Sequence, residues 1–194
     1  MSALYPVFLK LEGLPVVVVG GGPVAAAKLD GLLAAGARVT VIAPEIVESI
    51  LARDVAVVLS EFQPAHLDGA RWVVAAATPE INREVASAAA ARGLFVNAVD
   101  EPATATAYLG GVVRRGPVEI AISTGGLAPA LAGLLREALD AILPEDLDRW
   151  IVVATAARHA WKRDGVAMAE RRPLLLRALD RLYTKPQGDG LVVW

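Results

Sequence analysis

Cysteine is absent from the 194-residue sequence, and only two histidines are present. The absence of thiols excludes disulfides, thiolate metal sites and a cysteine nucleophile, and it fits the reducing cytoplasm, where we expect the protein to reside. His66 and His159 have no partner at metal-ligand spacing. No metal site is therefore expected.

A large charge of one sign is also lacking, since the formal net charge is -2. Neither nucleic acid nor an anionic membrane surface is expected as a partner. The N-terminus lacks a basic segment followed by an apolar one, so no signal peptide is expected. The longest apolar runs, such as residues 72–78, are too short to cross a bilayer. Short runs of Val, Ala and Leu are instead typical of parallel strands that are covered on both faces.

Apolar runs alternate with helix-period segments over the first 110 residues. Helices are expected at 24–35 and 81–92, each ended by a glycine, Gly36 or Gly93. Strands are expected at 15–19, 39–43, 55–59, 72–77 and 95–99. This order predicts an α/β fold with a Rossmann-type parallel sheet and right-handed crossovers.

The pattern changes after residue 110. A hairpin is expected from strands at 108–113 and 118–123 around a turn at 114–117. Helices are expected at 129–143, 146–163 and 171–183. The predicted organisation is a Rossmann domain at 1–110, a small α+β region at 111–145 and a helical C-terminal subdomain at 146–194. Basic residues in the last segment either form a solvated helix face or contact an anionic substrate.

A glycine-rich turn, Gly20-Gly21-Gly22-Pro23-Val24-Ala25, joins the first expected strand to the first expected helix. In this context Gly20-x-Gly22-x-x-Ala25 matches the dinucleotide fingerprint. Gly20 makes the tight turn, Gly22 lets the backbone approach the pyrophosphate, and Ala25 lets helix and strand pack closely. The alternative is a glycine turn with a purely structural role.

The acidic residue that usually ends the second strand of such a unit is missing, because the strand closes with Ala43-Pro44-Glu45. The cofactor ribose is expected to meet either Glu45 or the backbone around Pro44. No Lys or Arg follows before Arg53, so a 2′-phosphate would find little positive charge. NAD is therefore favoured over NADP.

Two further features follow the expected sheet. Asp100 comes directly after the fifth strand, at the carboxyl edge where open α/β sheets bind ligands. It is a candidate general base or, alternatively, an ordinary turn residue. Ser123-Thr124-Gly125-Gly126 precedes a helix and predicts an anion-binding turn, a capping turn, or both.

Several motifs occur in a particular order along the chain: residues 6–9, Gly20 to Lys28, Ala76-Ala77-Thr78, Asn97-Ala98-Val99-Asp100 and residues 123–132. Over residues 4–145 the sequence resembles the precorrin-2 dehydrogenase family. This family comprises the N-terminal module of siroheme synthases and its stand-alone relatives, some of which are also sirohydrochlorin ferrochelatases.

The resemblance implies NAD-dependent oxidation of precorrin-2 to sirohydrochlorin by a homodimer, with the α+β region at 111–145 as its dimerisation region. It places cofactor contacts at Pro23, Val24, Pro44, Glu45 and near Thr78. The family's essential aspartate matches Asp100, whereas Thr124 stands where the fused enzymes carry a phosphorylatable serine. A bound polycarboxylate tetrapyrrole would suit the turn at 123–126. The alternative functions are a metal chelatase, alone or in addition, and an NAD-sensing regulatory module without catalysis.

Overall fold

The computed structural model describes residues 4–183, so the last part of the expected helical subdomain, 184–194, lies outside the described residues. Its contacts divide the chain into two compact units. The first contains the chain up to residue 109 together with 123–128, and the second contains 110–122 and the chain from 129 onward. The three-part division expected from the sequence stays a prediction, and each unit is described by itself.

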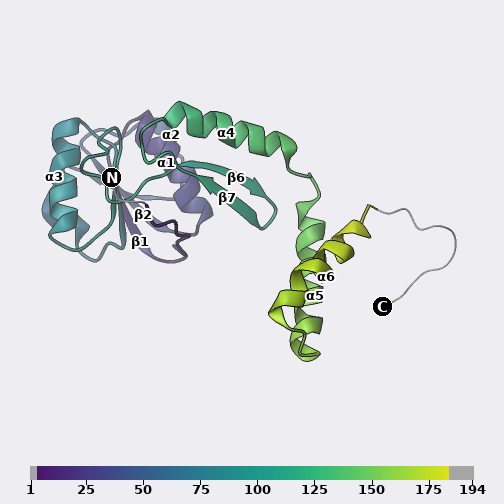
Figure 1. Cartoon of the computed structure of the whole chain (residues 1–194). Helices are drawn as coiled ribbons and strands as arrows, with labels where there is room; N and C mark the ends of the chain where they lie inside the picture. The colour runs from purple at the N-terminus through teal and green to yellow at the C-terminus, as the bar shows by residue number, and fades with distance from the viewer. Residues whose placement is uncertain (1–3, 184–194) are drawn as a thin grey trace. The chain divides into compact units, whose positions relative to one another are not determined.

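A five-stranded parallel sheet forms the centre of the first unit (Figure 1). The strand order is β3-β2-β1-β4-β5. The strands are β1 (Pro15–Val19), β2 (Arg38–Ala43), β3 (Ala56–Leu59), β4 (Trp72–Ala75) and β5 (Val96–Ala98). The Rossmann-type parallel sheet expected from the sequence is thereby confirmed.

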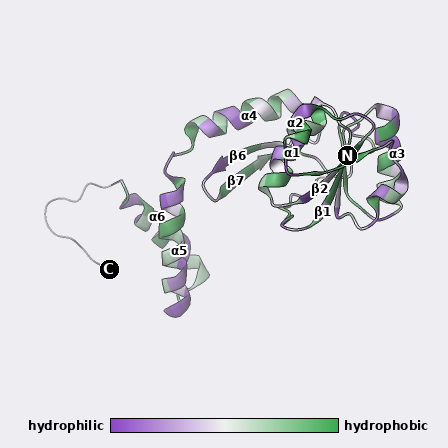
Figure 2. Ribbon diagram, turned by 180° about the vertical axis from the view of Figure 1, so that it is seen from behind, coloured by the Kyte–Doolittle hydropathy of each residue, from purple (hydrophilic) through white to green (hydrophobic). Residues whose placement is uncertain are grey.

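Helices cover both faces of this sheet, as Figure 1 shows. Helices α1 (Pro23–Ala34) and α2 (Glu48–Leu51) pack on one face, and α3 (Pro79–Ala90) and the 3-10 helix η1 (Pro64–Leu67) on the other. Along β1, Val16 and Val18 belong to the core between the sheet and α1 and α2. Val17 and Val19 belong to the core on the other face, under α3 and η1. A strand buried on both faces has no polar alternation, which explains its continuous valine run. Hydropathy colouring shows these central strands as apolar (Figure 2).

The boundaries of several elements differ from the expected ones. Strand β4 ends at Ala75, two residues early, because the Ala77 N–H bonds the Asn82 side chain rather than a strand. The elements α2 and η1 are not expected from the sequence, since four residues are too few to display a helical period. Helix α1 ends as expected, with Gly36 at φ +74°.

The second unit begins with an antiparallel hairpin of β6 (Gly111–Arg115) and β7 (Val118–Ile122). Strand β6 starts three residues later than expected, because the chain at 106–107 still bonds the Val96 carbonyl oxygen. It extends through Arg115, so the turn shrinks to two residues, with Gly116 at φ +53°. Helix α4 (Pro129–Ile142) packs on the hairpin.

Two helices follow, α5 (Leu147–Arg163) and α6 (Met168–Asp180). The Tyr183 hydroxyl accepts from Trp150 Nε1 (2.5 Å) and donates to the Asp146 carboxylate (3.0 Å), which ties the two helices together. Helix α6 begins three residues before the expected start and contains Pro173. Among residues 4–183 no helix is long and apolar enough to cross a membrane. A cytoplasmic location stays a prediction.

Candidate active site

The chain reverses its direction of travel across the sheet between β1 and β4. From β1 it proceeds outward to β2 and β3, and it then returns to β4 and continues to β5. In open parallel sheets such a switch point opens a crevice at the carboxyl ends of the two central strands, where ligands bind. The glycine turn follows β1, and the segment containing Thr78 follows β4.

Close backbone contacts hold the glycine turn between β1 and α1. The Gly20 N–H donates to the Ile42 carbonyl oxygen (2.9 Å), and Gly20 adopts φ +127°. A Cβ atom at Gly20 would overlap the Ala76 carbonyl oxygen, and one at Gly21 would overlap the Glu45 carbonyl oxygen. These two positions therefore require glycine for the fold itself, whatever they bind.

Gly22 differs from its two neighbours. It is the N-cap of α1 with φ -91° and ψ -175°, and a Cβ atom there would meet nothing within 4 Å. Pro23 follows at the first helical position, no side chain caps the helix, and its first turn has no acidic residue. The first N–H groups of the helix thus have no side-chain cap, and the space beside Gly22 is open. This arrangement fits a diphosphate.

The end of β2 carries two exposed residues, Pro44 and Glu45. This segment is joined to the glycine turn, because the Val47 N–H donates to the Gly21 carbonyl oxygen (2.9 Å). The first cation downstream, Arg53, is engaged elsewhere: it pairs with Asp30 (3.0 Å) and donates to the carbonyl oxygen of residue 26. Its guanidinium group therefore already has two partners on α1.

Thr78 is the N-cap residue of α3 and follows the end of β4 closely. The N-terminus of α3 already carries an acidic side chain in its first turn, Glu80. The Glu80 backbone N–H first, and the Thr78 hydroxyl second, hold the pKa of the Glu80 carboxyl below its usual range, with Arg83 adding to the effect. The termini of α1 and α3 thus differ: only the latter has an acidic side chain in its first turn.

Asp100 follows β5 and is exposed. Among residues 4–183 it is the one non-glycine residue with positive φ, at +58°. This left-handed conformation is unfavourable for most L-residues, but Asp and Asn tolerate it best. Surrounding contacts must hold it. One of them is the bond that the preceding Val99 N–H donates to the Ala75 carbonyl oxygen (2.9 Å).

The turn at 123–126 is internally hydrogen-bonded. Ser123 Oγ accepts from the Gly125 N–H (3.1 Å), and Thr124 Oγ1 accepts from the Ala128 N–H (3.3 Å). Both glycines have positive φ. Both donors precede α4, which begins at Pro129, so these bonds order the turn itself, and the choice between a capping and an anion-binding role stays a prediction.

This turn packs beside the segment that follows Asp100. A Cβ atom at Gly126 would lie 3.3 Å from the Tyr108 ring and 3.5 Å from Pro102 Cβ. The Tyr108 hydroxyl donates to the Pro102 carbonyl oxygen (2.9 Å), which closes the segment on itself. The fold therefore brings the turn at 123–126 next to the loop that contains Asp100, a proximity that separation along the sequence does not predict.

Two residues that the sequence reasoning missed help to shape this edge, Asn82 and Tyr108. Asn82 is 2% exposed, and its side chain bonds the chain after β4 and the chain after β5. A signal for it exists in the sequence: positions 82, 85, 86 and 89 form the buried face of α3, and Asn82 is the one polar residue among them. An amide on an apolar helix face indicates a specific buried partner.

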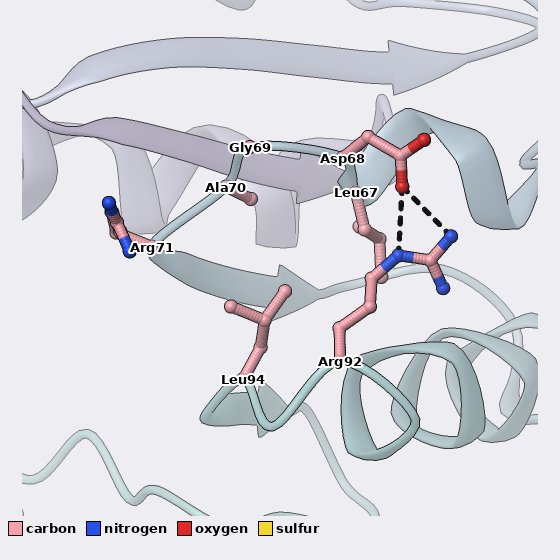
Figure 3. A pocket seen from close by; sticks show the side chains of 7 residues that line it. All are labelled: Leu67, Asp68, Gly69, Ala70, Arg71, Arg92 and Leu94. Atoms are coloured by element: carbon pink, nitrogen blue, oxygen red, sulfur yellow. Dashed lines mark hydrogen bonds and ion pairs between the residues drawn. The ribbon is translucent and has the colours of Figure 1, made fainter.

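A separate hollow of about 320 Å³ lies at the opposite edge of the sheet (Figure 3). Arg71 and Leu94 in its wall closely precede the amino ends of β4 and β5. Arg92, also in the wall, is paired with Asp68 at 2.9 Å. None of the candidate site residues lines this hollow. Among residues 4–183 no group of three His, Asp or Glu side chains could hold a metal ion.

A parallel sheet covered on both faces, with a glycine turn and an uncapped helix at its switch point, defines a dinucleotide-binding protein of the Rossmann type. A family model described as putative NAD(P)-binding matches residues 7–111, and one described as sirohaem biosynthesis protein central matches residues 115–141.

Curated relatives extend this match. Siroheme synthase 1 of Aeromonas salmonicida is 41% identical over 185 residues, which cover 91% of this chain and 39% of the relative. Siroheme synthase 2 of Aeromonas hydrophila is 40% identical over 197 residues, which cover 97% of this chain and 42% of the relative. The chain thus spans about two fifths of the length of these relatives.

Among solved structures, SirC, a precorrin-2 dehydrogenase, matches with a TM-score of 0.71 and 25% identity, covering 93% of this chain and 92% of that one. The chain belongs to the family of the siroheme synthase N-terminal module, whose members include NAD(P)-dependent precorrin-2 dehydrogenases. The family resemblance drawn from the sequence motifs is confirmed.

Proposed function

We propose that this chain oxidises precorrin-2 to sirohydrochlorin with NAD. The observation that carries the proposal is the open terminus of α1 behind Gly22, on the same sheet edge as Asp100. The similarity to SirC, a precorrin-2 dehydrogenase, supports this choice of substrate.

The cofactor is assigned to the carboxyl ends of β1, β2 and β4. The turn from Gly20 and Gly22 to Pro23 and Val24, at the start of α1, presents its backbone to the diphosphate position. When bound, the nicotinamide supplies a hydride acceptor. Thr78 borders this position from the side of β4.

NAD is preferred over NADP because of the residues after β2. Pro44 and Glu45 are exposed there. A carboxylate would repel a 2′-phosphate but can accept a hydrogen bond from a ribose hydroxyl. Arg53, the first downstream cation, is already paired with Asp30 on α1.

Asp100 is assigned as the general base. Oxidation of precorrin-2 removes two hydrogens, one as a hydride that passes to NAD and one as a proton that must leave to a base. The carboxylate accepts that proton. Its place after β5 puts it on the same edge as the cofactor turn.

The turn at 123–126 is assigned to the carboxylates of the tetrapyrrole. Ser123 and Thr124 already accept hydrogen bonds from backbone N–H groups. A hydroxyl has one donor in addition to its acceptor lone pairs, so each can still donate to a carboxylate. Gly125 and Gly126 leave the backbone there free of side chains. The hydrogen bonds within the turn are therefore compatible with substrate binding.

A homodimer is proposed from the exposed apolar side of α4. Leu131, Leu135 and Ile142 follow a helical spacing along one side and are 48%, 43% and 74% exposed. Ala132 marks the buried side, against the hairpin. Figure 2 shows apolar and polar residues alternating along this helix. An exposed apolar stripe of this kind supports an interaction surface on this helix.

The test is to give the purified full chain precorrin-2 and NAD and to follow NADH formation together with the macrocycle absorbance. Equal amounts of NADH and sirohydrochlorin are expected. Binding of NAD without NADH formation would favour a regulatory module instead. Adding Fe²⁺ or Co²⁺ to sirohydrochlorin with the protein then tests for a chelatase.

A further inference from the structure

A buried amide connects two parts of the candidate site. Asn82 lies near the start of α3 and is 2% exposed. Side chains on a helix point back toward its N-terminus, so Asn82 reaches the chain that precedes its own helix. Its Oδ1 accepts from the Ala77 N–H (2.9 Å), and its Nδ2 donates to the Val99 carbonyl oxygen (3.2 Å).

These two bonds join the ends of neighbouring strands. Ala77 follows β4, directly after the Ala76 carbonyl group that packs on Gly20. Val99 follows β5, and its carbonyl group belongs to the peptide that leads into Asp100. Because the Val99 N–H is bonded to Ala75, both sides of this residue are fixed.

We propose that Asn82 is a positioning residue that holds Asp100 in its left-handed conformation through the Val99 carbonyl group and the chain after β4. This proposal rests on the proposed function, in which Asp100 is the base. Without the amide, the Val99 carbonyl group loses its partner, and the peptide before Asp100 is free to rotate. The glycine turn keeps its own backbone bonds to residues 42 and 47, so cofactor binding is maintained.

The test compares Asn82→Ala with Asn97→Ala. Asn97 is the matched control, since it is also a buried amide (7% exposed) but donates to the Ala107 carbonyl oxygen. In Asn82→Ala we expect kcat to fall by about ten- to a hundred-fold, with the KM for precorrin-2 and the NAD affinity little changed. In Asn97→Ala we expect kcat to stay near wild type at temperatures below unfolding.

A second variant, Asn82→Asp, tests the same bonds in case Asn82→Ala does not fold. A protonated carboxyl reproduces the amide's pattern of one acceptor and one donor, whereas the ionised form cannot donate to the Val99 carbonyl oxygen. The kcat of this variant relative to wild type at the same pH should therefore rise as the pH is lowered. A ratio that is flat with pH would contradict the proposal.

Amide hydrogen exchange in the protein without substrate gives a readout that needs no activity. Exchange of the Ala77 N–H should be faster in Asn82→Ala and unchanged in Asn97→Ala. Wild-type kcat in Asn82→Ala would overturn the positioning role. A wild-type protein without turnover would instead count against the proposed function, and the exchange measurement would still decide whether Asn82 holds this edge.

Discussion

Replacement of Gly22 by alanine separates cofactor binding from folding. A Cβ atom at this position meets nothing within 4 Å. The backbone angles of Gly22 are also accessible to alanine, so the variant should fold. The added methyl group would occupy the space in which the diphosphate is proposed to approach the helix terminus, so NAD should bind more weakly.

The two effects differ in size. Alanine is a poorer N-cap than glycine by about 1 kcal/mol or less. For a chain of this length, that lowers Tm by roughly 2–4 °C. Loss of hydrogen bonds to a charged group costs about 1.5–3 kcal/mol. The Kd for NAD should then rise roughly ten- to a hundred-fold.

Isothermal titration with NAD and thermal unfolding without it measure the two quantities. Gly31→Ala is the matched control, since Gly31 lies on the exposed side of the same helix and its Cβ atom would also meet nothing within 4 Å. That variant should be more stable by about 0.5–1 kcal/mol and bind NAD as wild type does. If Gly22→Ala also bound NAD like wild type, the glycine turn would not hold the diphosphate.

Three further predictions concern the remaining assignments. Asp100→Asn should keep the left-handed backbone and the NAD affinity but lose about 10²- to 10⁴-fold in kcat; near wild-type turnover would remove Asp100 from the mechanism. Glu80→Gln should be less stable than wild type at neutral pH, because a carboxyl whose pKa is lowered on folding stabilises the fold above its unfolded pKa. This difference should vanish as the pH falls through the lowered pKa, and a gap that persists in acid would contradict the charge interaction. Leu135→Glu should give a monomer by light scattering, whereas Leu51→Glu, at another exposed leucine, should leave a dimer intact.

The fold could be predicted largely from hydrophobic patterning. The valine run of β1 and the glycines after α1 and α3 are local signals, so they place most elements within a few residues. The errors arise where a non-local bond decides the boundary. Pairing of residues 106–107 with Val96 delays β6, and the Asn82 side chain ends β4 early.

The candidate site was predictable only in part. Glycine spacing indicates Gly20 and Gly22 because both the turn and the ligand approach demand small residues in a fixed order. The fingerprint assigns the tight turn to Gly20 and the ligand approach to Gly22, but it does not show the contacts behind these roles: a Cβ atom at Gly20 would overlap the Ala76 carbonyl group, whereas one at Gly22 would meet nothing within 4 Å. Likewise, nothing local indicates that Asp100 adopts positive φ, since the bonds that hold it come from β4 and α3.

The N-termini of α1 and α3 differ in charge, and this difference favours binding of the cofactor phosphates at α1. Helices α1 and α3 both start after a central strand, and both have proline at the first helical position. Helix α3 already carries the Glu80 carboxylate against its own N–H groups, whereas α1 begins with Pro23, Val24 and Ala25 and has no anion. A diphosphate at α3 would have to displace the Glu80 carboxylate or be repelled by it. At α1 the diphosphate would itself be the anion that stabilises the helix N-terminus. The absence of an acidic residue after Gly22 is therefore as informative as the glycines themselves.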